Sequence, residues 1–179
     1  DSKAFFDDTW AYDPATNTWT ELTPTGDVPP ARCAAAMVYD SADGRAILFG
    51  GTSGEAFLND TWEWDGTDWI EMKPATIPTA RSGHMMAYDE ERGVVVMFGG
   101  EERTGTYMLN DTWEWDGKAW TLISPALSAP ARESALMFFD PLRQSVVLFG
   151  GYFFDQLTQT SIFLEDVWEW DGESWRRLD

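Results

Sequence analysis

Aromatic residues beside carboxylates are the groups in this sequence best suited to hold a ligand. The stretch YFFDQLTQTSIF at 152–163 places three aromatic side chains next to an aspartate, and a second stretch holds two glutamates and a tyrosine at 101–107. Rings stack on flat ligands while carboxylates accept hydrogen bonds, a combination suited to a peptide or a sugar. The predicted ligand-binding residues are Phe57, Glu101, Glu102, Tyr107, Tyr152, Phe153, Phe154 and Asp155. In the alternative interpretation, the aromatic residues simply pack on the body of the protein or on a neighbouring unit.

The remaining reactive residue types are rare. His84 is the single histidine and Cys33 the single cysteine, so no internal disulfide can form. Cys33 lies in a run that predicts an interior strand, and we expect a small buried thiol there. His84 has Ala35 and Ala135 as its counterparts in the other repeats, and we expect it to be structural rather than catalytic. Nucleophile elbows, phosphate loops and zinc-ligand pairs are missing, so we expect no catalytic residue, metal or cofactor.

Composition and charge limit the classes of partner that this chain can bind. The 179 residues carry a formal net charge of −19, and 44% of them are hydrophobic, including 11 tryptophans. Such a chain can fold around a core, and it lacks the clustered basic residues that nucleic acid requires. No stretch approaches the roughly 18 apolar residues of a membrane span. We expect a soluble protein with a protein or carbohydrate ligand. A secreted and a cytoplasmic bacterial protein both fit the sequence, which does not decide the compartment.

A repeat explains most of the sequence. NDTWEWDG occurs at 59–66 and 110–117, EDVWEWDG follows at 165–172, and the looser DDTWAYDP lies at 7–14. A period near 50 residues indicates stacked structural units. The residues that recur with this period, and that we expect to be structural, are Arg32, Arg81 and Arg132; the glycine pairs Gly50, Gly51, Gly99, Gly100, Gly150 and Gly151; and the tryptophans Trp62, Trp69, Trp113, Trp120, Trp168 and Trp175.

Each repeat predicts four strands. Two apolar runs, such as HMMAYD and VVVMFGG, flank a turn, and TWEWDG and a short segment beginning with tryptophan follow. Helical periodicity is absent, so four strands per repeat predict the blades of a β-propeller, each covering its neighbour with tryptophans. The glycine pairs fit positive φ or close chain approach. The arginines fit a bracing role against carboxylates, or alternatively a common anion site. We expect Asp60, Asp111 and Asp166 to accept hydrogen bonds from turn amides, and the alternative for them is metal binding.

The sequence resembles the Kelch repeat. The resemblance rests on ARSGHMMAYDEERGVVVMFGG followed by NDTWEWDGKAW, and on DDTWAYDPATNTW near the start, and it covers essentially the whole chain. Tryptophan stands where the family more often has tyrosine, for example at Trp115. The resemblance implies an all-β propeller of four-stranded antiparallel blades that serves in most cases as a protein-interaction module and in a minority as an enzyme. The copper-radical oxidases of this fold need two histidine ligands, and this chain has one histidine.

The predicted units do not complete a ring. We expect a half blade at 1–22, whole blades at 31–72, 80–123 and 131–179, and fourteen strands in all, which is three and a half blades. Known propellers have four to eight blades. We therefore expect a fragment of a longer propeller, or a ring completed by self-association or by other chains.

One loop varies between repeats. The distance from the second glycine of each pair to the first WEWDG tryptophan grows from 11 to 13 to 17 residues, whereas the other spacings hold. Insertions in repeat proteins collect on one face, often the binding face. We expect a non-catalytic module that binds a protein or carbohydrate through these loops. The alternatives are a sugar-epimerase-like enzyme using Glu101 and Asp155, and a purely architectural repeat.

Overall fold

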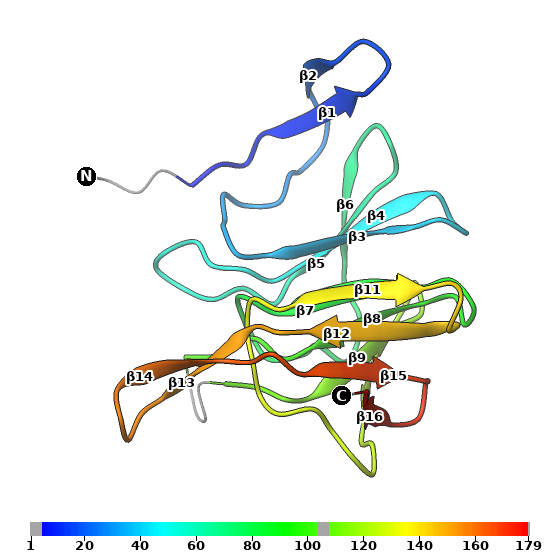
Figure 1. Ribbon diagram of the computed structural model, residues 1–179. Helices are drawn as coiled ribbons and strands as arrows, with labels where there is room; N and C mark the ends of the chain where they lie inside the picture. The colour runs from blue at the N-terminus through cyan, green and yellow to red at the C-terminus, as the bar shows by residue number, and fades with distance from the viewer. Residues whose placement is uncertain (1–4, 104–107, 179) are drawn as a thin grey trace.

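The computed structural model describes residues 5–103 and 108–178, and within them the chain is all-β, with no helix (Figure 1). The prediction of four-stranded antiparallel units is confirmed. The described strands are β1 (Thr9–Asp13), β2 (Thr18–Leu22), β3 (Ala36–Asp40), β4 (Arg45–Phe49), β5 (Thr61–Trp64), β6 (Trp69–Met72), β7 (Met85–Asp89), β8 (Val94–Phe98), β9 (Thr112–Trp115), β10 (Trp120–Ile123), β11 (Leu136–Asp140), β12 (Ser145–Phe149), β13 (Tyr152–Asp155), β14 (Thr160–Phe163), β15 (Val167–Trp170) and β16 (Trp175–Arg177).

The strands form three four-stranded sheets and two separate hairpins. Sheet 1 contains β3 to β6, sheet 2 contains β7 to β10, and sheet 3 contains β11, β12, β15 and β16. Neighbouring strands are antiparallel and follow chain order, so each sheet is a meander, and in sheet 3 the β13–β14 hairpin is inserted between β12 and β15. The N-terminal hairpin β1–β2 lies above sheet 1, and sheets 2 and 3 follow below it (Figure 1).

Two apolar layers hold the sheets together. Ile47 and Phe49 of sheet 1 pack against Met97, Trp115 and Trp120 of sheet 2. A second layer of the same kind joins sheet 2 to sheet 3. A fully buried tryptophan removes about 150–250 Å² from water, which is worth about 4 to 6 kcal/mol at 25 cal/mol per Å². The repeated tryptophans are therefore a large part of what joins one sheet to the next.

The same hydrogen bond crosses every interface between neighbouring units. The indole Nε1 of Trp120 donates to Oγ1 of Thr61 in the preceding sheet, at 2.9 Å. Trp175 donates in the same way to Thr112, and Trp69 donates to Thr9, both at 2.9 Å. The threonine of each motif therefore accepts the indole N–H of the tryptophan that begins the fourth strand of the next repeat. The fourth copy of the motif has Val167 at the threonine position.

An arginine in each repeat ties the two ends of the variable loop together. Arg81 donates to the carbonyl oxygen of Gly99 at 3.0 Å, where the loop begins, and makes two bonds of 2.8 Å to the carboxylate of Asp111, where it ends. Trp113 Nε1 also donates to that carboxylate, at 2.6 Å. We call this arrangement the arginine clamp, and the same contacts join Arg32 to Asp60 and Arg132 to Asp166.

The clamp carboxylates are held in their charged form. Burial alone would raise the pKa of Asp111, but the hydrogen bonds and charge of Arg81 and the indole of Trp113 outweigh burial, so the pKa is lowered from its usual value. Asp60 and Asp166 have lowered pKa values with their own arginines as partners. The turn amides instead bond to the aspartates that end the strands, as Asp89 does with the amides of Glu91 and Arg92. The expectation that the clamp aspartates accept hydrogen bonds from turn amides is therefore wrong, because their carboxylates accept from an arginine guanidinium and a tryptophan indole.

The glycine pairs have a backbone that other residues rarely adopt. Gly99 and Gly100 have φ values of 66° and 92°, and the other two pairs are alike. A Cβ on Gly100 would lie 2.7 Å from the carbonyl oxygen of Ser82, closer than real contacts allow. Both positive φ and close chain approach therefore require glycine here.

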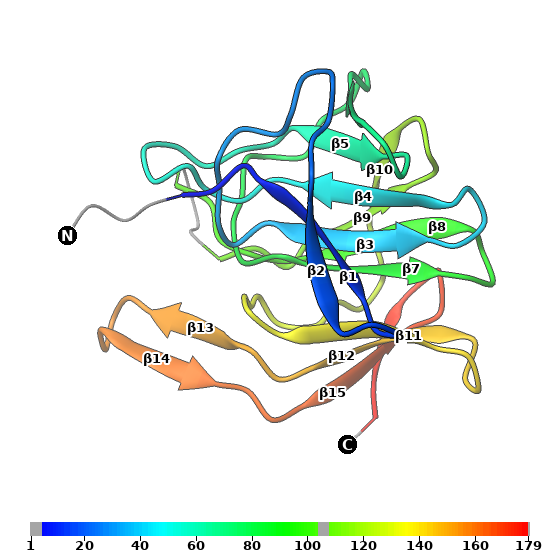
Figure 2. The ribbon, with the colours of Figure 1, turned by 90° about the horizontal axis from the view of Figure 1, so that it is seen from above.

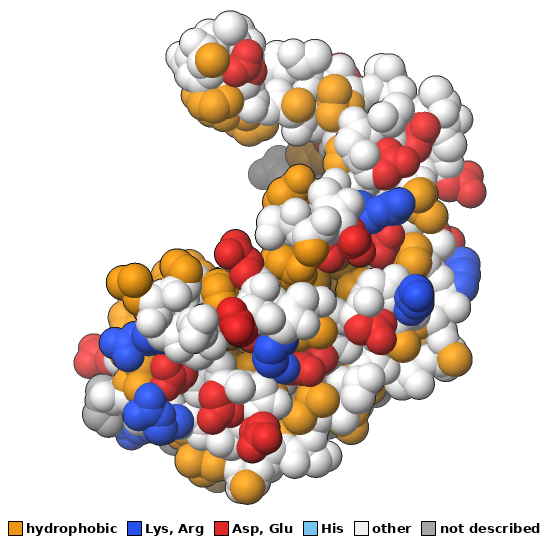
Figure 3. Space-filling view, turned by 90° about the vertical axis from the view of Figure 1, so that its right-hand side faces the viewer, with side chains coloured by type: hydrophobic (Ala, Val, Ile, Leu, Met, Phe, Trp, Pro, Cys, Tyr) orange, Lys and Arg blue, Asp and Glu red, His pale blue; other side chains and the backbone are white. Residues whose placement is uncertain are grey.

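The arc of sheets is open (Figure 3). Among the first strands of the sheets only β7 is buried along its whole length, so the expectation of an interior first strand in the run that contains Cys33 is wrong. Within the described residues, sheet 3 has a neighbouring sheet on one side only, and sheet 1 faces just the N-terminal hairpin on its other side. Both sheets therefore expose residues of their first strands, which are Met37, Tyr39, Leu136 and Phe138. The N-terminal hairpin exposes Trp10, Tyr12 and Trp19 in the same way, and a hollow of about 230 Å³ separates it from sheet 1.

Candidate functional site

The variable loops of the three sheets lie on one side of the molecule, the side of the N-terminus in both ribbon views (Figures 1 and 2). In each repeat, the first loop residue after the glycine pair forms an isolated β-bridge with the residue that follows the clamp arginine. These bridges are Cys33 with Thr52, Ser82 with Glu101, and Glu133 with Tyr152. The residues after the arginines therefore belong to the loop face.

The third variable segment is a β-hairpin, not an irregular loop. β13 and β14 pair from Tyr152 opposite Phe163 to Asp155 opposite Thr160. The two extra strands bring the described total to sixteen, so the prediction of fourteen was wrong. Asp155 accepts the amide of Leu157 and the hydroxyl of Thr158, both at 2.9 Å, and these bonds lower its pKa. Asp155 thus forms the turn of the hairpin.

A cavity of about 520 Å³ lies along this hairpin, from Tyr152 at its start to the turn residues Gln156 and Gln159, and we call it the hairpin pocket. Residues of sheet 2's loop, of the segment before β11 and of the hairpin itself line it. These residues are Glu101, Met108, Glu133, Tyr152, Phe154, Gln156, Gln159 and Ser161. Of the residues predicted to bind a ligand, Glu101, Tyr152 and Phe154 come together here, and Phe154 remains exposed. Glu133, the two glutamines and Ser161 were missed by the sequence analysis.

Two carboxylates set the electrostatics of the hairpin pocket. Glu133 is only 9% exposed, and burial raises the pKa of its carboxyl; the hydroxyl of Tyr152 lowers that pKa, and the charge of Glu101 raises it again. The pKa of Tyr152 is raised by burial and by Glu133. Ser82 Oγ lies 3.2 Å from Glu101 Oε1 and donates to it. The pocket therefore offers hydrogen-bond acceptors and negative charge next to aromatic rings.

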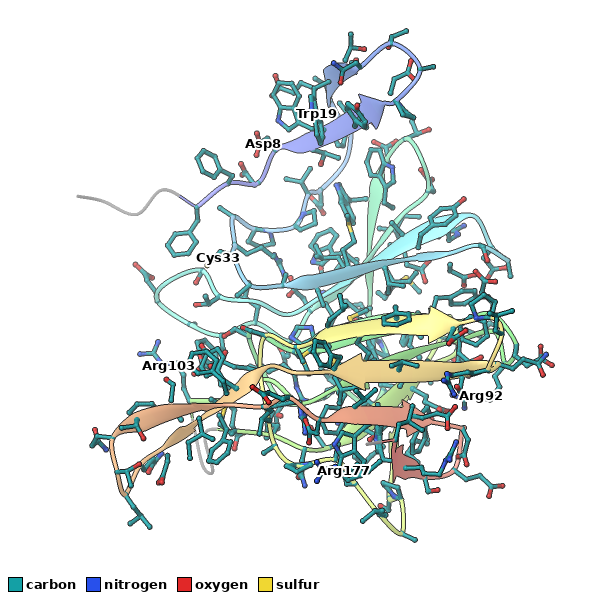
Figure 4. The ribbon with its side chains drawn as sticks, viewed as in Figure 1. Asp8, Trp19, Cys33, Arg92, Arg103 and Arg177 are labelled. Atoms are coloured by element: carbon teal, nitrogen blue, oxygen red, sulfur yellow. The ribbon has the colours of Figure 1, made fainter. Side chains whose placement is uncertain are left out.

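Phe57 lies in a different cavity, of about 970 Å³, which we call the Arg103 groove. Arg103 donates to the carbonyl oxygen of Glu55 at 2.8 Å, and its guanidinium lies 5.8 Å from the centre of the Phe57 ring. Cys33 also lines this groove, on the loop side of the molecule (Figure 4). The thiol is exposed, so the expectation of a buried cysteine was wrong: β3 begins only at Ala36, and the chain before it turns through Ala34 at a φ of 52°.

The other predicted binding residues that the structure describes line neither cavity. Phe153 sits on β13 opposite Ile162 and is half-buried. Glu102 is half-buried next to Glu101. Tyr107 lies outside the described residues. The predicted surface thus divides into a hairpin pocket, an Arg103 groove and single flanking residues.

His84 is enclosed between sheets 1 and 2. Its ring packs edge-on against Phe49, with 5.4 Å between ring centres, and is 5% exposed. Burial lowers the pKa of His84 to about 3, and the charge of Arg81 adds to this effect. The imidazole is therefore neutral at physiological pH, and it fills the space that alanines fill in the other sheets.

The fold and these two cavities define an all-β protein of stacked four-stranded sheets with a loop face. In the described ranges no group of three or more His, Cys, Asp or Glu side chains is placed to hold a metal ion. No helix in this part of the chain could cross a bilayer. In comparisons with known proteins, no family profile matches the chain, and no curated protein is significantly similar to it.

Proposed function

We propose that this chain is a Kelch-type β-propeller segment that acts as a non-catalytic carbohydrate-binding module. Support for the propeller comes from the repeated four-stranded meanders, the arginine clamp and the indole–threonine bond at each interface. In a propeller, each sheet is a blade and the variable loops share one end of the ring. The exposed faces of Trp19 and Leu136 support completion of the ring by further strands, from another copy or from additional blades.

The hairpin pocket carries the functional part of the proposal. Its volume of about 520 Å³ falls within the roughly 300–1,000 Å³ of small-molecule sites. A protein partner needs a larger interface, of about 800 Å² on each side. Amide, hydroxyl and carboxylate groups next to an exposed ring match the alternating polar edges and apolar faces of a sugar. A sugar is therefore the ligand class that this lining suits best.

Binding to an array of immobilised oligosaccharides tests the proposal. We expect some of the sugars to bind and to be released without chemical change. The variant Phe154→Ala should bind them about tenfold more weakly, because it lacks the ring that stacks on the sugar. Leu157→Ala is the matched control, because Leu157 is 95% exposed at the tip of the same hairpin. Absence of any sugar binding, or equal binding by a folded Phe154→Ala variant, would refute the proposed function. Retention of a protein in place of a sugar would favour the protein-ligand alternative.

A further inference from the structure

We propose that the hairpin pocket selects sugars that carry a free, protonated amino group over neutral and acidic sugars. This inference rests on the proposed sugar binding and names the ligand class. Its basis is a pair of carboxylates that line the cavity without a neutralising partner, beside two aromatic rings. A hexosamine ring presents hydroxyls, an apolar face and an ammonium group within one small ligand.

The carboxylates of the hairpin pocket lack a cation of their own. Among the described residues, the ion pairs between basic and acidic side chains include neither Glu101 nor Glu133. Glu133 is buried, and a buried charge is costly unless it is paired. The hydroxyl of Tyr152 partly compensates it, whereas Glu101 adds like charge. A ligand ammonium would supply the missing partner.

The arginines next to the pocket residues in the sequence make their contacts outside the pocket. Arg103 donates to the backbone carbonyl oxygen of Glu55 and lies over Phe57 in the separate groove. Arg81 and Arg132 are fully buried in their clamps with Asp111 and Asp166. The pocket lining itself contains no basic residue. A uronic acid or a phosphorylated sugar would therefore meet two carboxylates and no cation, which opposes its binding.

The aromatic residues favour the same ligand. Phe154 and Tyr152 both line the cavity, and the ring of Phe154 is exposed to it. Aromatic faces attract ammonium groups in addition to stacking on sugar rings. Gln156, Gln159 and Ser161 can bond to ring hydroxyls from the hairpin side. The charged and the neutral parts of an amino sugar thus each have a complementary part of the lining.

Titration calorimetry with three matched oligosaccharides tests the inference: glucosamine tetramer, its N-acetylated form and a galacturonic acid tetramer. We expect the glucosamine tetramer to bind at least about tenfold more tightly than the N-acetylated form, and the acidic tetramer not to bind. Glu133→Gln and Glu101→Gln keep the side-chain shape, and each should bring the affinities for the glucosamine tetramer and its N-acetylated form to within about twofold of each other. Thermal unfolding verifies that both variants fold.

A control separates the pocket from the general charge of the protein. The net charge of −19 attracts any cationic oligomer weakly. Glu173→Gln removes one exposed carboxylate from the turn after Trp170 and should leave the preference unchanged. If the preference survives Glu133→Gln and Glu101→Gln as it survives Glu173→Gln, bulk charge explains it and the inference is wrong. Equal affinity for the free and acetylated tetramers would also refute the inference but would leave the proposed sugar binding intact. If no tetramer and no sugar on the array binds, both the inference and the proposed function are wrong.

Discussion

Replacing Thr61 by valine isolates the hydrogen bond that joins sheet 1 to sheet 2. Thr61 is 1% exposed and accepts the indole N–H of Trp120, which is 2% exposed, at 2.9 Å. Valine has nearly the shape of threonine, so the substitution removes the acceptor and leaves the packing in place. The chain already has valine at the corresponding position, Val167. The backbone of this strand therefore accepts the change.

The cost follows from the buried indole. Leaving a buried donor unsatisfied costs about 1–3 kcal/mol, because the group loses its partner and cannot reach water. In a chain of this size, each kcal/mol lowers the melting temperature by about 2–4 °C. We therefore expect Thr61→Val to reduce the free energy of unfolding by about 1–3 kcal/mol. Thr121→Val, on the exposed face of β10, should change it by less than about 0.5 kcal/mol.

Urea unfolding of a double-mutant cycle measures the bond itself. Trp120→Phe removes the donor together with packed surface, so it should cost more than Thr61→Val. In the double variant the two losses should overlap by about 1 kcal/mol, since the bond can be lost only once. Additive losses, or a Thr61→Val variant as stable as Thr121→Val, would refute the role assigned to the indole–threonine bonds.

Two further predictions concern the clamp and the buried histidine. Asp111→Asn leaves the guanidinium of Arg81 buried without its partner charge, and we expect it to lower the free energy of unfolding by about 2–3 kcal/mol in urea. Breaking a fully enclosed ion pair would cost more, because the Asp111 side chain is 26% exposed. A loss below about 0.5 kcal/mol would contradict the role assigned to the clamp. The pKa of His84 is about 3 in the folded chain and 6.5 for the free side chain. Below pH 6.5 the imidazole therefore becomes protonated in the unfolded chain but stays neutral in the folded chain, so the free energy of unfolding should fall as the pH drops. Relative to His84→Gln, unfolding free energy should decrease by up to about 1.4 kcal/mol per unit between pH 6 and 5; parallel pH profiles for the two proteins would show that the imidazole is not buried.

The periodic features of the fold were predictable from the sequence because packing repeats with the chain. Each sheet needs the same tryptophans, glycines and arginine at the same places, so their spacing and the apolar runs between them indicated the four-stranded units and the variable loops. The start of β3 was misplaced because the chain before each first strand turns through a residue of positive φ. Gly83, with a φ of 65°, was the one sequence signal for this turn. Ala34 and Ser134 occupy the same position with positive φ, but their residue types do not indicate a turn.

The hairpin of the candidate site was missed although the sequence contains its pattern twice. DPATNT at 13–18 and DQLTQT at 155–160 share an aspartate followed by threonines three and five residues later. Both form the same turn, in which the aspartate bonds to the first threonine and the two threonine hydroxyls bond to each other. Asn17 and Gln159 have φ values of 54° and 56° in these turns. Glu133 could not be found from local sequence, because only the pairing with Tyr152 brings it to the pocket.

The arginine clamp makes the loop face suitable for diversification. It fixes the exit and re-entry points of each variable segment, at Gly50 and Asp60 in sheet 1 and at Gly150 and Asp166 in sheet 3. The segments between the glycine pairs and the clamp aspartates, 52–59, 101–110 and 152–165, differ in length while the clamp geometry is the same. A display library that randomises these segments and keeps the arginines, glycines and aspartates would therefore present new specificities on an unaltered scaffold.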